Sequence, residues 1–166
     1  HKTREGVFNE IYDTNYWGSD ESISGTGSEF LQTELISKEL PKVFEIYNIK
    51  TFLDAPCGDF QWMKRVIDKY DINYIGADIV KALIENNNEA YSNEKINFIH
   101  LDICKDTMPK SDLMLCRDCL FHLSFQDIKS FFIKFIDSNI QYLLLTNHKQ
   151  SNKKFENLDI QTGDFR

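Results

Sequence analysis

The first clear hydrophobic pattern runs from Phe30 to Tyr47, where apolar side chains return every three or four residues. This spacing predicts an amphipathic helix. Pro41 lies inside the pattern and is expected to kink or divide the helix, because its ring replaces a backbone N–H. The preceding residues 22–28 are rich in serine and glycine, which is typical of a loop, and Ser28 is suited to cap the helix.

From residue 50 onward, short apolar runs alternate with segments of helical spacing. The predicted strands are Thr51–Ala55, Asn73–Asp78, Ile96–Leu101, Asp112–Cys116 and Ile140–Thr146. The predicted helices between them are Trp62–Tyr70, Val80–Tyr91 and Phe125–Ile136. Apolar strands that alternate with helices are typical of a parallel sheet covered on both faces. We therefore predict a single doubly wound, mostly parallel α/β domain over residues 1–166, with an N-terminal helical lid (1–49) and an α/β core (50–166).

The charge of the chain argues against a nucleic-acid partner. Its 166 residues carry 26 acidic and 19 basic side chains, a formal net charge of −7. An acidic surface repels phosphate backbones, and the richest basic run, Lys149 to Lys154, contains only three lysines. We expect a small-molecule partner, and the pattern leaves the oligomeric state open.

Cysteine usage and hydropathy favour the cytoplasm. The chain has four cysteines: Cys57, Cys104, Cys116 and Cys119. They follow no secretory signal peptide, which favours reduced thiols over a disulfide framework. The most apolar run, Ile140–Thr146, is far shorter than a membrane span, so no membrane partner is predicted. The abrupt ending at Arg166 suggests that the natural chain extends further.

Three acidic residues stand where successive predicted strands end: Asp54, Asp78 and Asp102. Ligands of doubly wound sheets bind beyond the carboxyl ends of the strands, so these carboxylates are candidates for a common site. Asp54 is suited to an ammonium group and Asp78 to the two hydroxyls of a ribose. Asp102, with the apolar Ile103 after it, is suited to an exocyclic amine and an aromatic ring face. One such acid is more often a turn or helix cap, but three in succession favour a ligand.

The turn after the first strand, Leu53–Phe60, contains a single glycine, Gly58. Glycine at a strand-to-helix turn lets backbone amides approach a ligand closely. A dinucleotide-binding fold needs the G-x-G-x-x-G pattern to accommodate a pyrophosphate. The single glycine therefore disfavours an NAD(P)-dependent oxidoreductase. Such an enzyme also has a doubly wound fold, so it stays as the alternative interpretation of this sequence.

Together these residues resemble the motifs of class I S-adenosylmethionine-dependent methyltransferases, which have a Rossmann-like, seven-stranded core. Leu53–Phe60 is similar to motif I, commonly Asp-x-Gly-x-Gly-x-Gly, with Pro56 and Phe60 in place of the first and third glycines. Asp78 is similar to the acidic residue of motif II, and Cys116-Arg-Asp118 falls where motif IV leaves the fourth strand.

The resemblance implies S-adenosylmethionine as the cofactor and a role for each matching position. The implied contacts are Asp54, Ala55, Pro56 and Gly58 for the methionine, Asp78 and Ile79 for ribose and adenine, Asp102 and Ile103 for the adenine edge, and the Cys116 backbone carbonyl for the ammonium. In the lid, the Trp17 indole and the Ser28 hydroxyl are candidate donors to the cofactor carboxylate. Trp17 is equally suited to pack as an aromatic of the core or lid.

Three segments also resemble a bacterial small-molecule branch of this superfamily, which includes enzymes that decorate surface-carbohydrate precursors. They are Trp17-Gly18, the loop Ser24–Ser28 and the stretch Asp54–Trp62. The fourth predicted strand is not followed by the Asn/Asp-Pro-Pro-aromatic tetrapeptide of methyltransferases that modify bases. The resemblance thus implies methyl transfer to oxygen or nitrogen of a small, sugar-linked or anionic metabolite. A non-catalytic, methyltransferase-like binding or scaffold protein is the alternative outside the enzymes.

Histidine is the side chain best suited to accept a proton from the methyl acceptor near neutral pH. His122 lies four residues after Asp118, so a helical turn would let Asp118 orient its imidazole. His148 follows the fifth strand at the same end of the sheet, and Arg117 is suited to an anionic acceptor. Each has a plainer interpretation: a packed residue for His122, a solvated loop for His148, and pairing with a neighbouring acid for Arg117.

The segment from Cys116 to Cys119 matches the C-x-x-C pattern. A structural zinc site needs a second such pair or histidines at set spacing, and a thioredoxin-like motif is expected near the first helix of the core. The sequence offers neither, so no metal or redox site is predicted.

Overall fold

A five-stranded parallel sheet forms the middle of the computed structural model, which describes residues 2–147 and 156–165. Its strands are β1 (Thr51–Asp54), β2 (Asn73–Asp78), β3 (Ile96–His100), β4 (Leu113–Cys116) and β5 (Tyr142–Leu145). They lie in the order β3-β2-β1-β4-β5, which confirms the predicted α/β class. The seven strands implied by the resemblance are wrong for the described residues, because residues 156–165, after β5, form neither strand nor helix.

Consecutive side chains of β1 pack into two different cores. Phe52 belongs to one hydrophobic cluster and Leu53 to the other, and both are fully buried. Phe52 lies opposite Tyr74 of β2 and Leu113 of β4 in the sheet register. Successive residues of a strand point to opposite faces, so an apolar run with both faces covered becomes a central strand.

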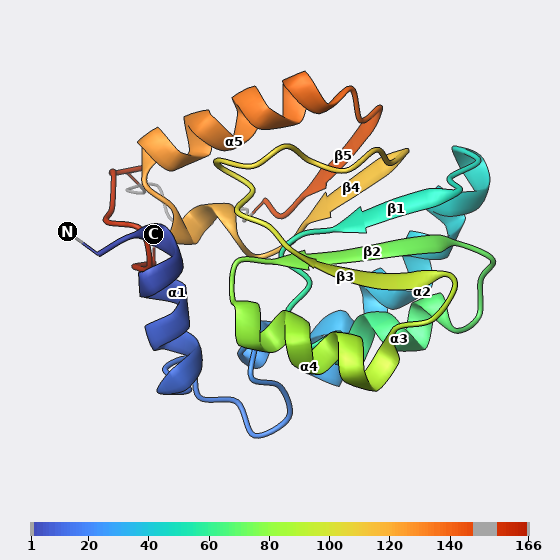
Figure 1. Cartoon of the computed structure of the whole chain (residues 1–166), viewed down its shortest axis with the longest axis horizontal. Coiled ribbons are helices and arrows are strands. Elements are labelled where there is room, and N and C mark those ends of the chain that lie inside the picture. Colours follow the sequence, from blue (N-terminus) through green and yellow to red (C-terminus); the bar gives the residue numbers. More distant parts are fainter. Residues whose placement is uncertain (1, 148–155, 166) are drawn as a thin grey trace.

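The helices lie on both faces of the sheet and across one end of it (Figure 1). They are α1 (Arg4–Asp13), α2 (Phe30–Ile46), α3 (Gln61–Ile67), α4 (Lys81–Tyr91) and α5 (Phe125–Ser138). Helix α5 covers one face, and α2, α3 and α4 cover the other. Helix α1 stands at the end towards which the strand arrows point, so it crosses the carboxyl ends of the strands.

The N-terminal region differs from its prediction in three respects. Helix α2 runs unbroken through Pro41, and burial of Leu40 and Phe44 against the core holds it there. Ser28 does not cap it: Ser28 ends a short 3₁₀ turn, Thr26–Ser28, one residue before the actual cap. Because α2 packs against the sheet, only α1 and the loop after it form the lid expected over residues 1–49.

Candidate active site

One cavity opens at the carboxyl ends of β1, β2 and β4, where the strand order reverses between β1 and β4. Ligands of doubly wound sheets bind at such a reversal. The predicted site residues that line the cavity are Trp17, Ser28, Asp54, Pro56, Gly58, Asp78, Ile79, Asp102, Ile103, Arg117, Asp118 and His122. Ala55 and Cys116 are fully buried and are not among the lining residues. His148 lies outside the described residues.

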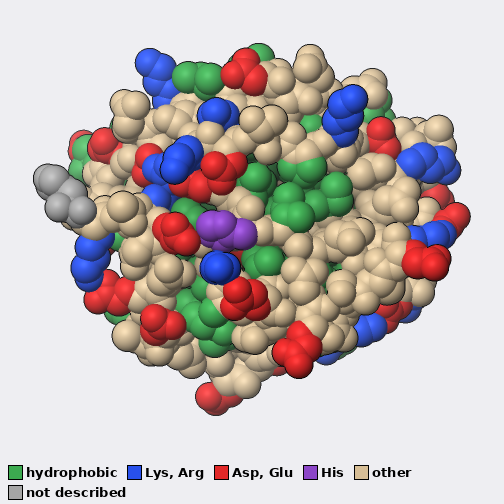
Figure 2. All heavy atoms as spheres, in the orientation of Figure 1, with side chains coloured by type: hydrophobic (Ala, Val, Ile, Leu, Met, Phe, Trp, Pro, Cys, Tyr) green, Lys and Arg blue, Asp and Glu red, His purple; other side chains and the backbone are tan. Residues whose placement is uncertain are grey.

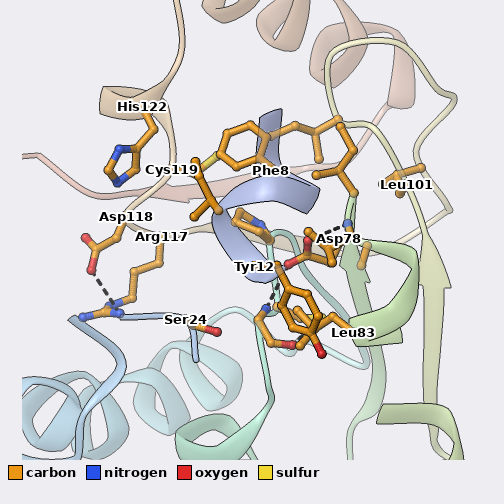
Figure 3. A pocket seen from close by; sticks show the side chains of 18 of the residues that line it. Phe8, Tyr12, Ser24, Asp78, Leu83, Leu101, Arg117, Asp118, Cys119 and His122 are labelled. Atoms are coloured by element: carbon orange, nitrogen blue, oxygen red, sulfur yellow. Dashed lines mark hydrogen bonds and ion pairs between the residues drawn. The ribbon is translucent and has the colours of Figure 1, made fainter. Parts of the chain in front are cut away.

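Figure 3 shows two chemically different sides of this cavity. Arg117, Asp118 and His122 lie together on one side, all from the segment after β4. Asp78 and Leu83 lie on the other side, next to the turns that follow β1 and β2. The cavity therefore offers buried acid on one side and a cation and an imidazole on the other.

Asp54 ends β1 as a carboxyl group that is only 2% exposed. The Tyr74 hydroxyl donates a hydrogen bond to its Oδ2 over 2.8 Å. Burial raises the pKa of Asp54 to about 7, although the Tyr74 hydrogen bond and the charge of Arg117 both act to lower it. A buried carboxylate of this kind gains most from a cationic ligand group, such as an ammonium.

Asp78 ends β2 and holds together the two turns on its side of the cavity. Its Oδ2 accepts from the Gly58 backbone N–H over 3.1 Å, and its Oδ1 accepts from Val80 over 3.0 Å. Burial raises the pKa of Asp78, and these backbone donors oppose the shift. The plain interpretation as a turn-capping acid therefore holds, and Asp78 lines the cavity as well.

Asp102, after β3, faces a cation of the protein itself. The Arg4 guanidinium of α1 donates to both carboxylate oxygens, with Nη2 at 2.9 Å from Oδ2. Arg4 also forms an ion pair with Asp127 at the start of α5. Asp102 additionally accepts from the Cys104 backbone N–H over 2.9 Å. The acid predicted at the adenine edge thus joins the lid helix to the core.

The serine- and glycine-rich loop between α1 and α2 is anchored to the motif I turn through Asp59. Its Oδ2 accepts from the Ser22 hydroxyl over 2.8 Å and from the Ile23 N–H over 3.2 Å. The Asp59 N–H in turn donates to the Ser24 hydroxyl over 3.1 Å. Gly58 has φ +55, and a Cβ built on it would lie 2.2 Å from the Ser24 Oγ, so this close approach requires glycine.

Phe60 occupies the position of the third glycine of motif I, and its buried ring compensates for the loss of that glycine. It precedes α3 with φ +63, a left-handed conformation that favours glycine. Its ring is fully buried, with its centroid 4.8 Å from that of Tyr74 and 5.0 Å from that of Phe98. Aromatic packing at this position stabilises the strained backbone.

The predicted pairing of Asp118 with His122 through a helical turn is wrong. Asp118 has φ +48 and lies before the short 3₁₀ turn Leu120–His122, so no α-helical turn connects the two. Its Oδ2 instead forms an ion pair with Nη1 of Arg117 over 3.1 Å. Nη2 of Arg117 donates to the Gly27 carbonyl over 2.8 Å, so Arg117 holds the lid loop as well as its neighbouring acid.

The His122 ring has aromatic neighbours and one backbone partner. Its Nδ1 lies 2.9 Å from the Asp164 carbonyl oxygen, and the Trp17 ring centroid lies 5.0 Å from its own. Burial lowers the pKa of His122, although the Asp164 hydrogen bond and the charge of Asp118 act to raise it. Trp17 also packs against Phe8 of α1, in agreement with its interpretation as a lid aromatic.

Sequence reasoning missed the contribution of α1 to the cavity. Arg4, Phe8, Ile11 and Tyr12 all line it. Their spacing of four, three and one residues places them on one helical face, which is the only local signal that the sequence offered. Asp164 was also missed, and no local pattern marks a backbone carbonyl as a partner.

The four cysteines are free thiols; Cys57, Cys104 and Cys116 are buried and Cys119 is half-buried. A hydrogen bond to Cys119 is the main cause that raises the pKa of Cys116, and burial adds to it. Burial raises the pKa of Cys104 to about 12. The parts of the chain that the structure describes hold no group of three or more His, Cys, Asp or Glu residues that could bind a metal ion.

The parallel sheet with helices on both faces matches the Rossmann-like fold of solved methyltransferases. Human N-acetylserotonin methyltransferase, solved with S-adenosylmethionine, superposes with a TM-score of 0.59 at 15% identity, over 82% of this chain and 39% of that one. The N-methyltransferase NodS from Bradyrhizobium japonicum WM9, solved with S-adenosylhomocysteine, gives 0.59 at 11% identity, over 77% of this chain and 67% of that one.

The methyltransferase domain of a bacterial Hen1 protein (CtHen1) gives a TM-score of 0.59 at 12% identity, over 68% of this chain and 65% of that one. The chain thus spans less than two thirds of the human enzyme and of the Hen1 domain. At these identities the likeness concerns the fold. No family model matches the sequence, and no curated protein matches it either.

Proposed function

We propose that this protein is an S-adenosylmethionine-dependent methyltransferase that acts on an oxygen or nitrogen of a small metabolite. The observation that carries the proposal is the convergence of Asp54, Asp78 and Asp102 on one cavity at the strand-order reversal. Such a site suits a ligand with an ammonium group, a ribose diol and an exocyclic amine. The cavity also presents His122 and Arg117, which are suited to proton removal and to pairing with an anionic acceptor.

The residues present fit this cofactor. Asp54 would hold the ammonium together with the Cys116 carbonyl, and Asp78 would hold the ribose. Ile79, Ile103 and Asp102 would surround the adenine, and the backbone of residues 54–58 would approach the methionine, since Gly58 leaves no room for a side chain. Trp17 and Ser28 of the lid would donate to the carboxylate. When bound, S-adenosylmethionine would supply the electrophilic methyl group that is transferred to the acceptor.

The protein would align the acceptor, exclude water and accept one proton. Burial lowers the pKa of His122, which favours the neutral ring, and a neutral imidazole can take the acceptor's proton. Arg117, held by Asp118, would pair with an anionic acceptor. His148 is the second candidate base.

The charge distribution supports a small acceptor, and the cysteines support a location in the cytoplasm. On the face shown in Figure 2, the described lysine and arginine side chains are interspersed with aspartate and glutamate and form no continuous basic area. All four cysteines are free, which suits a reducing compartment. No helix among the described residues has the length and apolar character needed to cross a membrane. The lid loop and motif I turn, which resemble the bacterial branch, favour a sugar-linked or anionic acceptor.

Calorimetry with the purified chain tests the proposal. We expect S-adenosylmethionine and S-adenosylhomocysteine to bind and nicotinamide dinucleotides not to bind. Asp78→Ala should weaken cofactor binding by about 1–3 kcal/mol, because a buried hydrogen-bond partner is lost. Asp71→Ala is the matched control, since that carboxylate is 86% exposed and does not line the cavity.

Other results would reject the proposal. Binding of a nicotinamide dinucleotide alone would favour the oxidoreductase. Cofactor binding without methyl transfer to any acceptor would favour the scaffold protein. The same interpretation expects His122→Ala to have no measurable effect.

A further inference from the structure

The segment Gln161–Phe165 packs around His122, although it lies about forty residues later in the chain. The Gly163 N–H donates to the His122 carbonyl over 2.8 Å, and the Asp164 carbonyl lies 2.9 Å from Nδ1 of the ring. The Phe165 ring centroid lies 5.6 Å from that of His122. Two backbone groups and one side chain of this segment therefore hold a single residue of the cavity.

The partner of Nδ1 determines where the ring carries its proton. A carbonyl oxygen can only accept a hydrogen bond, so Nδ1 must be the protonated nitrogen. In the neutral ring, Nε2 then carries the lone pair, and the described residues make no hydrogen bond to it. The charged groups beside the ring are Asp118 and the Arg117 paired with it, and the packed side chains around it are aromatic.

The segment is itself fixed to α5 and to the lid. The Thr162 hydroxyl bonds to the Asp127 carboxylate and accepts from the Ser124 N–H over 3.0 Å. Gly163 has φ +105, and a Cβ built on it would lie 2.4 Å from Cγ1 of Val7 in α1. Only glycine fits this position without displacing the segment.

We propose that residues 161–165 are the positioning element of the catalytic base: the Asp164 carbonyl selects the His122 tautomer whose Nε2 can take the acceptor's proton. The inference rests on the proposed function, yet the tautomer can be observed without turnover. When the acceptor's proton passes to Nε2, the ring becomes an imidazolium, and Nδ1–H keeps its bond to the Asp164 carbonyl, which stabilises the charge.

Nitrogen-15 NMR of the histidine rings in the full chain tests this, with His122→Gln used to assign the His122 signals. Above the His122 pKa we expect a protonated Nδ1 and an unprotonated Nε2. In Gly163→Ala, displacement of Asp164 should populate the Nε2–H tautomer. Methyl transfer should fall about tenfold or more, whereas the cofactor dissociation constant stays within about twofold, because proton removal and not cofactor binding is affected.

Three further variants separate positioning from general damage. Val7→Ala in the Gly163→Ala background removes the Cγ1 that the new Cβ would meet, and should partly restore the Nδ1–H tautomer. Leu158→Ala changes an exposed side chain three residues before this segment and should change nothing. If Gly163→Ala does not fold, Phe165→Ala removes one ring contact with the backbone intact and should give a mixture of tautomers.

An Nε2–H tautomer in the unmodified protein would overturn the inference. An unchanged tautomer in a folded Gly163→Ala or Phe165→Ala variant would overturn it as well. If the proposed function is wrong, calorimetry will detect no heat of binding for the cofactor. The NMR spectra would still report the tautomer of His122 in that case.

Discussion

Asp54 carries the clearest conflict between stability and function at the scale of single residues. Its carboxyl group is buried and its pKa lies at about 7, compared with an ordinary value of 3.8. An acid with a raised pKa in the folded state contributes stability that is present below pH 4 and is lost as the pH rises through 7. The unliganded protein therefore loses stability over this range as the carboxyl group ionises, and the anion that forms is the state that the proposed cationic ligand group would bind.

Asp54→Asn should show this conflict directly. The amide keeps an acceptor for the Tyr74 hydroxyl but cannot ionise, so the variant should gain stability relative to the parent as the pH rises from 5 to 8. Cofactor affinity at pH 8 should fall about 10- to 100-fold, the magnitude of a lost charged hydrogen bond. Urea unfolding at several pH values and calorimetry measure the two effects. Asp137→Asn, at an exposed position, is the control, and a stability difference independent of pH would contradict the assignment.

His122 gives a second prediction at this scale. Because burial lowers its pKa, the ring stays neutral to a lower pH than an ordinary histidine, and methyl transfer should persist into mildly acidic solution. The rate of transfer from a saturating cofactor, followed from pH 5 to 8, should fall only as the pH drops through this lowered pKa. An inflection above 6.5 would point to another base.

At the scale of elements, the turn between β1 and α3 replaces glycine flexibility with aromatic packing. Phe60 adopts a left-handed conformation at the start of α3, and its ring packs against Tyr74, Tyr91 and Phe98. The adjoining Asp59 binds the lid loop. This turn therefore contacts both the hydrophobic core, through Phe60, and the lid loop, through Asp59.

Phe60→Ala should destabilise the fold by about 3–5 kcal/mol, because a fully buried ring leaves a cavity. Phe60→Gly should be less harmful than Phe60→Ala by about 1 kcal/mol, since glycine adopts the positive φ without strain. Denaturant unfolding measures both. The test is which of the two variants is the more stable. At a position with ordinary backbone angles, the alanine variant would be more stable than the glycine variant.

At the scale of the whole molecule, Arg4 connects the lid to the two halves of the core. It binds Asp102 after β3 and Asp127 at the start of α5, on opposite sides of the strand-order reversal. Asp127 in turn bonds Thr162 of the segment that holds His122. These ion pairs and this hydrogen bond thus link α1 to the segment around His122, the proposed base.

Arg4→Met should loosen α1 without unfolding the core. The change removes the charge and keeps much of the side-chain length, so amide exchange in α1 should accelerate while exchange in β1 and β4 stays unchanged. Hydrogen–deuterium exchange measures this. Lys2→Met is the matched control, because it breaks an exposed ion pair with Glu10 of α1. Equal acceleration of exchange in both variants would show that Arg4 does not have this role.

Much of this architecture follows from local pattern. All five strands and three core helices were predicted within a few residues, because a doubly covered parallel sheet requires apolar runs such as Phe52-Leu53 between helical segments. The acids at strand ends were predicted for the same reason: the carboxyl ends of parallel strands lie at one edge, so Asp54 and Asp78 had to meet there. Periodicity and position along the chain carry this information.

The partners of the site residues were decided only by the tertiary structure. Arg4 binds Asp102 across 98 positions of sequence, and His122 binds the Asp164 carbonyl across 42. The expected Asp118–His122 pair failed because a left-handed residue and a 3₁₀ turn replaced the assumed helix. Local preferences determine which segments form strands and helices, whereas contacts between distant segments depend on how the lid and the last residues pack over the sheet.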